Sequence, residues 1–198
     1  MSLAAYYAVT WMQDEATEIA HGLRHRDPEV LDRLIEQYQH RLFRYLVYLT
    51  GNRTAAEDLF QETWVRVLER GRQYDGKSKF ETWLFAIARH LLIDSLRRKS
   101  AASLDALRDP EEGTAPYEPA DEGPSAYESL AGREQEAQVT AAIAGVPAVY
   151  REVLVLRFQE DLKLEEIASV VGAPVSTVKS RLYRGLEAIR QALQGGQA

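Results

Sequence analysis

The segment from Leu164 to Arg190 constrains the fold of this 198-residue chain more than any other part of it. Its sequence, LEEIASVVGAPVSTVKSRLYRGLEAIR, predicts two helices joined by a tight turn. Gly172 allows the left-handed backbone that commonly ends a helix, and Pro174 suits the start of the next one. This is the pattern of a helix-turn-helix, whose second helix lies in the major groove of DNA.

A helical wheel of the second helix separates an apolar side from a polar one. The side chains expected to pack inward are Val175, Val178, Leu182, Leu186, Ile189 and Leu193. The candidates for contacting duplex DNA are Ser176, Thr177, Lys179, Ser180, Arg181, Tyr183 and Arg184. Hydroxyl and basic groups of this kind contact base edges and phosphates. The alternative is an amphipathic hairpin with a solvated outer face, but the coincidence of turn glycine, small Ala168 and basic face favours DNA binding.

The net charge of −6 is unusual for a DNA-binding protein, so its distribution matters. Ten of the 30 acidic and two of the 24 basic residues lie in 101–136, which leaves 20 acidic and 22 basic residues elsewhere. The same segment holds four of the seven prolines. Because it cannot bury enough apolar surface to offset its ordering entropy, we expect a flexible acidic linker over 101–136. It would join an N-terminal domain, 1–100, to a C-terminal domain, 137–198.

Helical spacing of apolar residues dominates both flanks of the linker, and no segment alternates as a strand does. Asp27-Pro28 predicts the start of a helix and Gly51 its end, while Thr54–Glu57 and Ser78–Glu81 resemble capping boxes. The apolar stripes are Leu31, Leu34, Ile35, Tyr38, Leu42, Tyr45, Leu46 and Leu49; Leu59, Phe60, Trp64, Val67 and Leu68; and Phe80, Trp83, Leu84, Ile87, Ala88, Leu91 and Leu92. Further helices are expected near 15–25, 133–144, 147–158, 164–171 and 175–193. The predicted fold is all-α: an N-terminal helical bundle and a four-helix C-terminal domain containing the helix-turn-helix.

The chain has no cysteine, which excludes disulfides and Cys-ligated zinc and fits a reducing cytoplasm. His21 and His25 stand four residues apart with Glu18 nearby, a spacing that can bind zinc, but no fourth ligand and no HExxH motif is visible, so we expect neither a metal nor a cofactor. No apolar run reaches the roughly 20 residues that span a bilayer, so membrane insertion is not expected. The first residues lack the basic leader of a signal peptide, and Met12 is a second candidate for the natural start.

Two segments, in order across the linker, resemble one protein family. PVSTVKSRLYRGLEAIRQAL, preceded by VPAVYREVLVLRFQEDLKLEEIA, resembles the C-terminal domain of extracytoplasmic-function (ECF) sigma factors of the sigma-70 family. AAEDLFQETWVRVLE and FETWLFAIARHLLIDSLRR resemble their N-terminal domain. The resemblance implies a subunit that binds core RNA polymerase and directs it to promoters, and that is often held inactive by an anti-sigma factor.

The resemblance also implies roles for individual residues. Docking on the clamp coiled coil of the largest polymerase subunit would use Asp58, Gln61, Glu62 and Arg66. Capture of the −10 element as a single strand would use Lys77, Ser78, Lys79, Arg89, His90, Arg97 and Arg98. The helix-turn-helix would read the −35 element, and its domain would contact the flap of the second-largest subunit. His90 replaces a common asparagine of the family, and Gly185 replaces a common alanine.

Simpler interpretations exist for most of these residues. The polar face around Asp58 fits a solvated helix surface. Arg97 and Arg98 fit an ordinary basic helix end and can pair with Asp94. Trp83 lies on the packing stripe, which favours a core position over a wedge that melts DNA. Phe85 lies off that stripe but could pack under the N-terminal helix.

Two other classes of function compete with a sigma factor. A stand-alone dimeric helix-turn-helix regulator would need a dimerisation helix or ligand pocket in the N-terminal domain, and neither is evident. An enzyme would need a nucleophile with its base, a metal cluster or a phosphate-binding glycine loop, and none has the required spacing. We therefore expect a non-catalytic, cytoplasmic sigma factor.

Overall fold

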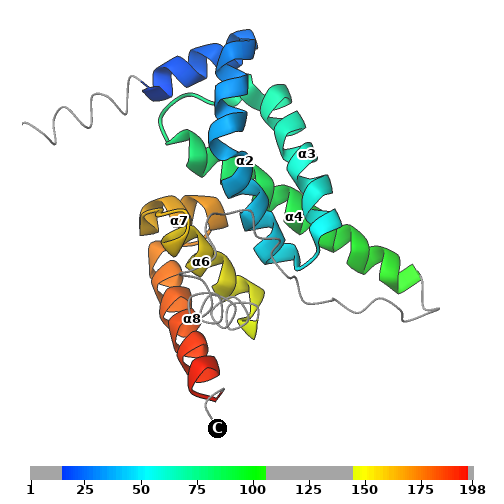
Figure 1. The fold of residues 1–198 in the computed structure, drawn as a ribbon, viewed down its shortest axis with the longest axis vertical. Helices are drawn as coiled ribbons and strands as arrows, with labels where there is room; N and C mark the ends of the chain where they lie inside the picture. Colours follow the sequence, from blue (N-terminus) through cyan, green and yellow to red (C-terminus); the bar gives the residue numbers. More distant parts are fainter. Residues whose placement is uncertain (1–14, 106–144, 196–198) are drawn as a thin grey trace, which may run out of the picture.

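The computed structural model describes residues 15–105 and 145–195, and these residues form helices and connecting loops without a strand. In chain order the helices are residues 15–25, α2 (Pro28–Thr50), α3 (Arg53–Arg70), the short 3₁₀ helix η1 (Gly71–Gln73), α4 (Phe80–Asp105), α6 (Ala148–Phe158), α7 (Leu164–Val171) and α8 (Val175–Gly195). Figure 1 shows them in two groups, which we call the N-terminal unit (15–105) and the C-terminal unit (145–195). The all-α prediction is confirmed for these residues.

The predicted linker and one predicted helix can be compared with these bounds only in part. Helix α4 continues to Asp105, so its last turn extends past the predicted linker start at 101. The rest of the linker, the predicted helix near 133–144 and the residues before 15 lie outside the described residues.

The ends of α2 follow the sequence signals. The Asp27 carboxylate accepts a hydrogen bond from the Glu29 N–H at 3.0 Å, and Pro28 occupies the first turn. Gly51 ends the helix with φ of 62°, and its N–H donates to the Val47 carbonyl at 2.9 Å. Both predicted boundaries are therefore confirmed.

The two predicted capping boxes are wrong. Helix α3 is capped by Asn52, whose side chain accepts from the Ala55 N–H at 2.9 Å, because the left-handed turn at Gly51 delivers this asparagine directly to the helix start. Helix α4 begins at Phe80 rather than after Ser78. The Glu81 carboxylate is held by Arg41 at 3.2 Å and by Lys79 at 3.5 Å, two side chains outside any capping motif.

The apolar stripes of α2, α3 and α4 meet in one core, with helix 15–25 packed on it. Leu34, Leu42 and Leu84 are fully buried. Phe85 is fully buried too, so it packs in the core, but its ring lies 5.0 Å from that of Tyr45 on α2 rather than under the N-terminal helix. Leu68 was expected inside but is 41% exposed, because it lies one position past Val67 and faces away from α2 and α4.

The helix-turn-helix forms as predicted. Gly172 has φ of 61°, and its N–H donates to the Ala168 carbonyl, which closes α7. Ile167, Val170 and Val178 are buried between α7 and α8. These contacts fix the angle at which α8 leaves the turn.

The far end of α8 departs from the expected packing. Leu186 and Leu193 were predicted to point inward but are 41% and 38% exposed. Helix α6 has 11 residues and α8 has 21, lengths of about 16 Å and 31 Å, so the last turns of α8, which carry Leu193, extend past α6. Gly185 of α8 permits close contact between α6 and α8, because a Cβ at this position would lie 2.9 Å from the Leu154 Cδ1.

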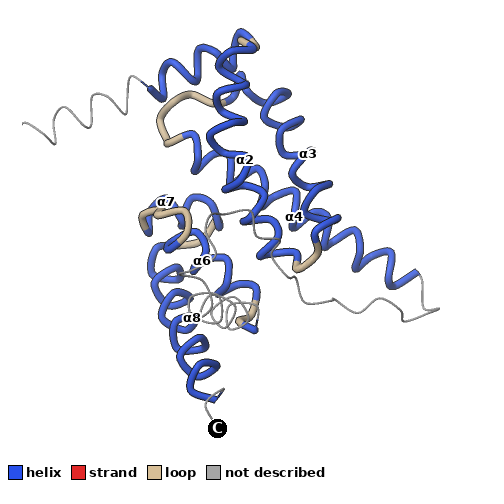
Figure 2. Tube along the Cα trace, viewed as in Figure 1, coloured by secondary structure: helices blue, strands red, loops and turns tan. Residues whose placement is uncertain are grey.

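The C-terminal unit packs against the N-terminal unit through α7 on α4 and α6 on α2. Figures 1 and 2 show α6 and α7 beside the middle of α2 and the first half of α4, with α8 on the outer side. Among the described helices, none combines the length and the apolar character needed to cross a bilayer.

Candidate functional site

The residues predicted to contact duplex DNA lie together on the outer face of α8. Ser176, Lys179, Ser180, Tyr183 and Arg184 are exposed, whereas Thr177 and Arg181 are half-buried. The Tyr183 side chain reaches 71% exposure, while Val178 on the opposite side of the helix is fully buried. Five of the seven residues are therefore exposed on the outer face of α8, and Thr177 and Arg181 lie at its flanks.

The base of this surface is supported by α6. The Arg184 Nη1 lies 3.4 Å from the Tyr150 hydroxyl, an exposed contact across the two helices. Nearly two turns further along α8, Arg190 pairs with Glu187 at 3.6 Å. The exposed basic and hydroxyl groups thus concentrate in the first half of α8, where a recognition helix presents side chains to base edges.

The residues predicted to dock on polymerase lie along one edge of α3. Asp58 and Gln61 are exposed, and Glu62 and Arg66 are half-buried. Arg66 bridges Glu62 at 3.0 Å and Glu69 at 3.1 Å, so part of this edge is already neutralised.

An open groove of about 660 Å³ separates this edge from α4. From α3 it is lined by Asp58, Glu62 and Arg66, and from α4 by Asp94, Arg97 and Arg98. Asp94 holds both arginines, with its carboxylate 3.3 Å from Arg97 and its carbonyl 3.3 Å from the Arg98 Nε. Both walls of the groove therefore carry carboxylate and guanidinium groups, with more carboxylates on the α3 side and more guanidinium groups on the α4 side.

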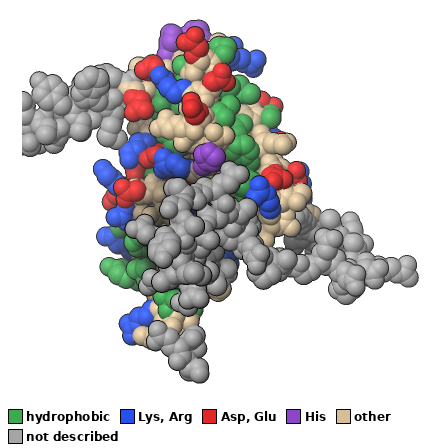
Figure 3. Space-filling model, viewed as in Figure 1, with side chains coloured by type: hydrophobic (Ala, Val, Ile, Leu, Met, Phe, Trp, Pro, Cys, Tyr) green, Lys and Arg blue, Asp and Glu red, His purple; other side chains and the backbone are tan. Residues whose placement is uncertain are grey.

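The residues predicted to capture single-stranded DNA do not form one cluster. Arg97 and Arg98 face the groove beside α3, whereas Lys79 and Arg89 face the C-terminal unit. His90 is exposed, and its Nδ1 lies 2.6 Å from the Ala86 carbonyl. On the face drawn in Figure 3, basic and acidic side chains lie next to one another instead of forming an area of one sign.

The loop 74–79, which carries Lys77 and Ser78, is held to the bundle at two points. The buried Tyr74 donates a hydrogen bond to the Ser78 carbonyl at 2.7 Å and packs against Trp83 with ring centres 5.3 Å apart. Gly76 has φ of 74°, and a Cβ there would lie 3.0 Å from the Ala16 carbonyl oxygen. The loop is thus fixed in shape while Lys77 and Ser78 remain exposed. Trp83 belongs to this aromatic packing, as predicted.

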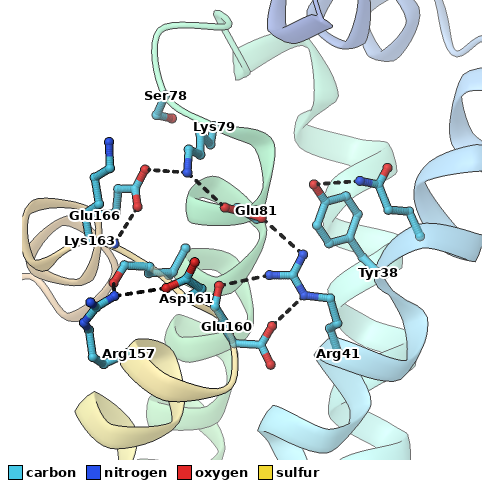
Figure 4. Close-up of polar contacts among 12 residues, drawn as sticks. Tyr38, Arg41, Ser78, Lys79, Glu81, Arg157, Glu160, Asp161, Lys163 and Glu166 are labelled. Carbon is cyan, nitrogen blue, oxygen red and sulfur yellow. Dashed lines mark hydrogen bonds and ion pairs between the residues drawn. The ribbon is translucent and has the colours of Figure 1, made fainter. Parts of the chain in front are cut away.

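Charged residues from both units meet over the seam between α2 and α4 (Figure 4). The Arg41 Nε lies 2.7 Å from Glu160, and its Nη1 lies 3.2 Å from Glu81. Glu81 also contacts Lys79, whose Nζ reaches Glu166 at 3.1 Å. The result is a continuous chain of alternating charges from the α6–α7 loop, across α2 and α4, to α7.

A second ionic contact lies deeper in the same seam. Glu152 of α6 accepts hydrogen bonds from Arg89 at 2.8 Å and from the Tyr45 hydroxyl at 3.1 Å. Burial raises the pKa of Glu152, and the neighbouring Arg89 and Tyr45 partly oppose that shift. Burial also raises the pKa of Tyr45 well above its ordinary value, so its hydroxyl remains a donor.

Comparison with known proteins agrees with this geometry. Two family models match the chain: Sigma-70 region 2 over residues 34–102 and Sigma-70, region 4 over residues 136–189. The chain is 32% identical over 170 residues to the ECF RNA polymerase sigma factor SigW of Bacillus subtilis, covering 85% of this chain and 91% of that protein. This chain is an ECF sigma factor. It therefore serves promoter-specific initiation by RNA polymerase.

Two further proteins are similar to this ECF sigma factor. It is 30% identical over 191 residues to the RNA polymerase sigma-H factor of Pseudomonas aeruginosa, covering 92% of this chain and 95% of that protein. The solved structure of the sigma factor RpoE of Bartonella quintana, in complex with the anti-sigma factor NepR, matches with a TM-score of 0.66 at 21% identity. That match covers 82% of this chain and 96% of the other, and it supports the fold.

Sequence reasoning missed the part that Arg41, Tyr45, Glu152, Glu160 and Glu166 play in this sigma factor. Glu160 and Arg41 are 119 positions apart, so no local pattern pairs them. Glu166 carries the one usable signal: its position at the start of α7 fits a capping acid, and its Oε2 accepts from the Lys163 N–H at 2.7 Å. The rings of His21 and His25 lie with their centres 4.2 Å apart and tilted by 38°, and the His25 Nδ1 lies 2.9 Å from the His21 carbonyl oxygen.

Proposed function

We propose that this ECF sigma factor binds core RNA polymerase, captures the −10 element as a single strand and reads the −35 element as duplex through α8. The observation that carries the proposal is the outer face of α8, where hydroxyl and basic side chains stand exposed on a helix locked by the turn at Gly172. That geometry suits insertion into the major groove, with polar groups toward bases and cations toward phosphates.

Polymerase docking is assigned to the edge of α3 formed by Asp58, Gln61, Glu62 and Arg66. Three of the four line or border an open groove that includes guanidinium groups from α4. A partner helix with charges of both signs would complement such a groove, and the clamp coiled coil of the largest subunit is the partner that we propose. The flap of the second-largest subunit would contact the C-terminal unit.

Capture of the −10 strand is assigned to the loop 74–79 and the face of α4 that begins at Lys79. The loop combines exposed Lys77 and Ser78 with a fixed backbone, which suits an extruded base and its phosphates. The chain would accordingly divide into the domain 1–100, the acidic linker 101–136 and the domain 137–198, with α4 extending the first to Asp105.

Control by an anti-sigma factor forms part of the proposal. The Bartonella quintana sigma factor of similar fold was solved in complex with one. Since such a partner must compete with polymerase, the exposed α3 edge and the seam between α2 and α4 are the surfaces on which we would look for it. Because a sigma factor acts by binding core RNA polymerase, the proposal also places this protein in the cytoplasm.

Run-off transcription tests the function directly. Purified core polymerase from a bacterium, supplied with this protein and a genomic library, is expected to start transcripts at a restricted set of promoters that share −10 and −35 elements. Core enzyme alone provides the control. Random start sites with and without the protein would refute the proposal, whereas tight, specific duplex binding without polymerase would favour a stand-alone regulator.

A further inference from the structure

Three cations of the N-terminal unit are each held by a carboxylate of the C-terminal unit. Arg41 pairs with Glu160 at 2.7 Å, Lys79 with Glu166 at 3.1 Å and Arg89 with Glu152 at 2.8 Å. All three pairs cross from one unit to the other, and Figure 4 shows the first two in a single view. Because a carboxylate oxygen accepts from guanidinium and ammonium groups as a phosphate oxygen does, these contacts have the chemistry of a nucleic-acid backbone contact.

The cations lie along one seam. On α2, Arg41 and Tyr45 are one turn apart, and on α4 Glu81, Phe85 and Arg89 follow at the same step. Arg41 touches Glu81 at 3.2 Å, the Tyr45 and Phe85 rings are 5.0 Å apart, and Tyr45 and Arg89 share Glu152. The two helices therefore keep register here and place the cations in a row.

The C-terminal unit covers this row but not its own recognition face. The side chain of Glu160 is 0% exposed and that of Glu152 is 9% exposed, and their partners Arg41 and Arg89 are 29% and 19% exposed. In the same arrangement the outer face of α8 remains open. Single-stranded DNA is thus kept from the row while duplex DNA can still reach α8.

The contact between Arg41 and Glu160 satisfies only part of the buried Glu160 carboxylate. Arg41 spreads its guanidinium over Glu160 Oε2, the Glu160 carbonyl and Glu81, so each of its three nitrogens donates one hydrogen bond. The second oxygen of Glu160 accepts no hydrogen bond among the described residues, and the nearest guanidinium, that of Arg44, is 3.6 Å away. A buried carboxylate left half-satisfied is a poor permanent partner, which suits a contact that is exchanged for another.

We propose that Arg41, Lys79 and Arg89 form one binding row for the backbone of single-stranded DNA, and that Glu160, Glu166 and Glu152 occupy it in the free sigma factor in place of phosphates. The inference rests on the proposed function, which assigns Lys79 and Arg89 to the −10 strand, and it adds Arg41 of α2 to that surface. The carboxylates must leave before the strand enters, so opening of the two units precedes capture of the −10 element.

The test measures binding of a fluorescent single-stranded oligonucleotide to the full-length free protein by anisotropy, over a series of salt concentrations. The double variant Glu160→Gln with Glu166→Gln keeps side-chain size and the hydrogen bond that starts α7, but removes two of the competing charges. We expect its affinity to rise about tenfold, with a steeper dependence on salt.

The matched control is Asp161→Asn with Glu165→Gln, which removes the same charge from exposed neighbours in the same unit. Its affinity is expected to stay within about twofold of the wild type, since only long-range charge changes. If both double variants gain affinity equally, or neither gains any, the proposal is overturned.

Adding Arg41→Gln to the Glu160→Gln, Glu166→Gln variant tests whether the gain in affinity comes from strand binding by Arg41 or only from separation of the two units. If Arg41 binds the strand, this third substitution removes most of the gain in affinity; if it serves only to hold the units together, the gain persists and Arg41 is excluded from the row. Circular dichroism melting of each variant checks that the helices remain folded. Run-off transcription by the wild type distinguishes failure of this inference from failure of the proposed function, because promoter selection would persist in the first case alone.

Discussion

The recognition face of α8 and the cation row of the N-terminal unit represent two ways of building a surface for nucleic acid. The first lies on one helix, and its residues follow each other within nine positions, from Ser176 to Arg184. The second draws Arg41 from α2 and Lys79 and Arg89 from α4, and the C-terminal unit covers it. A surface on one helix needs only a correct turn and a buried side, whereas a surface across helices depends on how whole units pack.

The largest effect is expected from Val178→Asp. Val178 is fully buried between α7 and α8, and an unpaired carboxylate there should cost about 3 kcal/mol or more of folding free energy. The C-terminal unit should unfold, and transcription from promoters that need a −35 element should be lost. Thermal melting and run-off transcription measure the two effects.

Ser180→Asp on the exposed side is the control for Val178→Asp. It should leave the melting temperature nearly unchanged while still weakening DNA binding, because the new charge faces phosphates. A stable Val178→Asp variant would show that the recognition face does not depend on its buried side.

Arg89→Ala tests the seam, with Arg97→Ala as its exposed counterpart. Loss of Arg89 leaves the buried Glu152 without its cation, so the free energy of unfolding should fall by about 2 kcal/mol near neutral pH. Arg97 is 80% exposed beside Asp94, and its removal should change stability by less than about 0.5 kcal/mol.

The loss of unfolding free energy caused by Arg89→Ala should increase as the pH rises. Burial already raises the pKa of Glu152, and losing Arg89 raises it further. A group with a raised pKa in the folded state stabilises the fold below its unfolded pKa and loses that contribution as pH rises through the folded pKa. Urea unfolding should therefore show a small deficit near pH 4 and a larger one near pH 7; an equal deficit at both would mean that Glu152 is not the group left unpaired.

Arg184→Ala tests the recognition face itself. Among the described residues its guanidinium contacts the Tyr150 hydroxyl, at 3.4 Å and at an exposed site, so folding should be nearly unaffected. Removing a groove contact worth about 1–2 kcal/mol should lower −35-dependent transcription about tenfold. If wild-type protein transcribes equally well from promoters with intact and scrambled −35 elements, this assignment fails.

The smallest effect is expected from Asp58→Ala with Glu62→Ala on the α3 edge. Both carboxylates border the open groove, and Arg66 retains Glu69 after the change, so stability should shift by less than about 0.5 kcal/mol. Affinity for core polymerase should fall about fivefold, measured by co-purification or surface binding. Glu36→Ala, exposed on α2, is the control; unchanged co-purification of the double variant would remove this edge from the docking surface.

The elements could be predicted from the sequence because their signals are local. Asp27, Gly51 and Gly172 act within one turn of the residues they cap, and the apolar stripes repeat within each helix. The capping box at Thr54 failed because Asn52, placed by the preceding turn, caps α3 instead. The one at Ser78 failed because α4 begins at Phe80 and the Glu81 carboxylate pairs with Arg41 and Lys79.

The grouping of the predicted strand-binding residues could not be derived in the same way. Arg89 and Arg98 stand nine positions apart on α4. That is about two and a half helical turns, so they lie on opposite faces of the helix and meet different neighbours. The carboxylates opposite Arg41 and Arg89 come from beyond the linker, and only the packing of the two units assigns them.

Glu166 has a consequence for hybrid proteins built by joining halves of different sigma factors. Its Oε2 starts α7 by accepting from the Lys163 N–H, while its Oε1 holds Lys79 of the other unit. Because each oxygen serves one partner, a transplanted C-terminal half keeps its own helix start whatever N-terminal half it is joined to. Compatibility between parental halves would then be decided at position 79, where the lysine donates to Glu166, and a single exchange there would change how tightly the two halves of a chimera are held together.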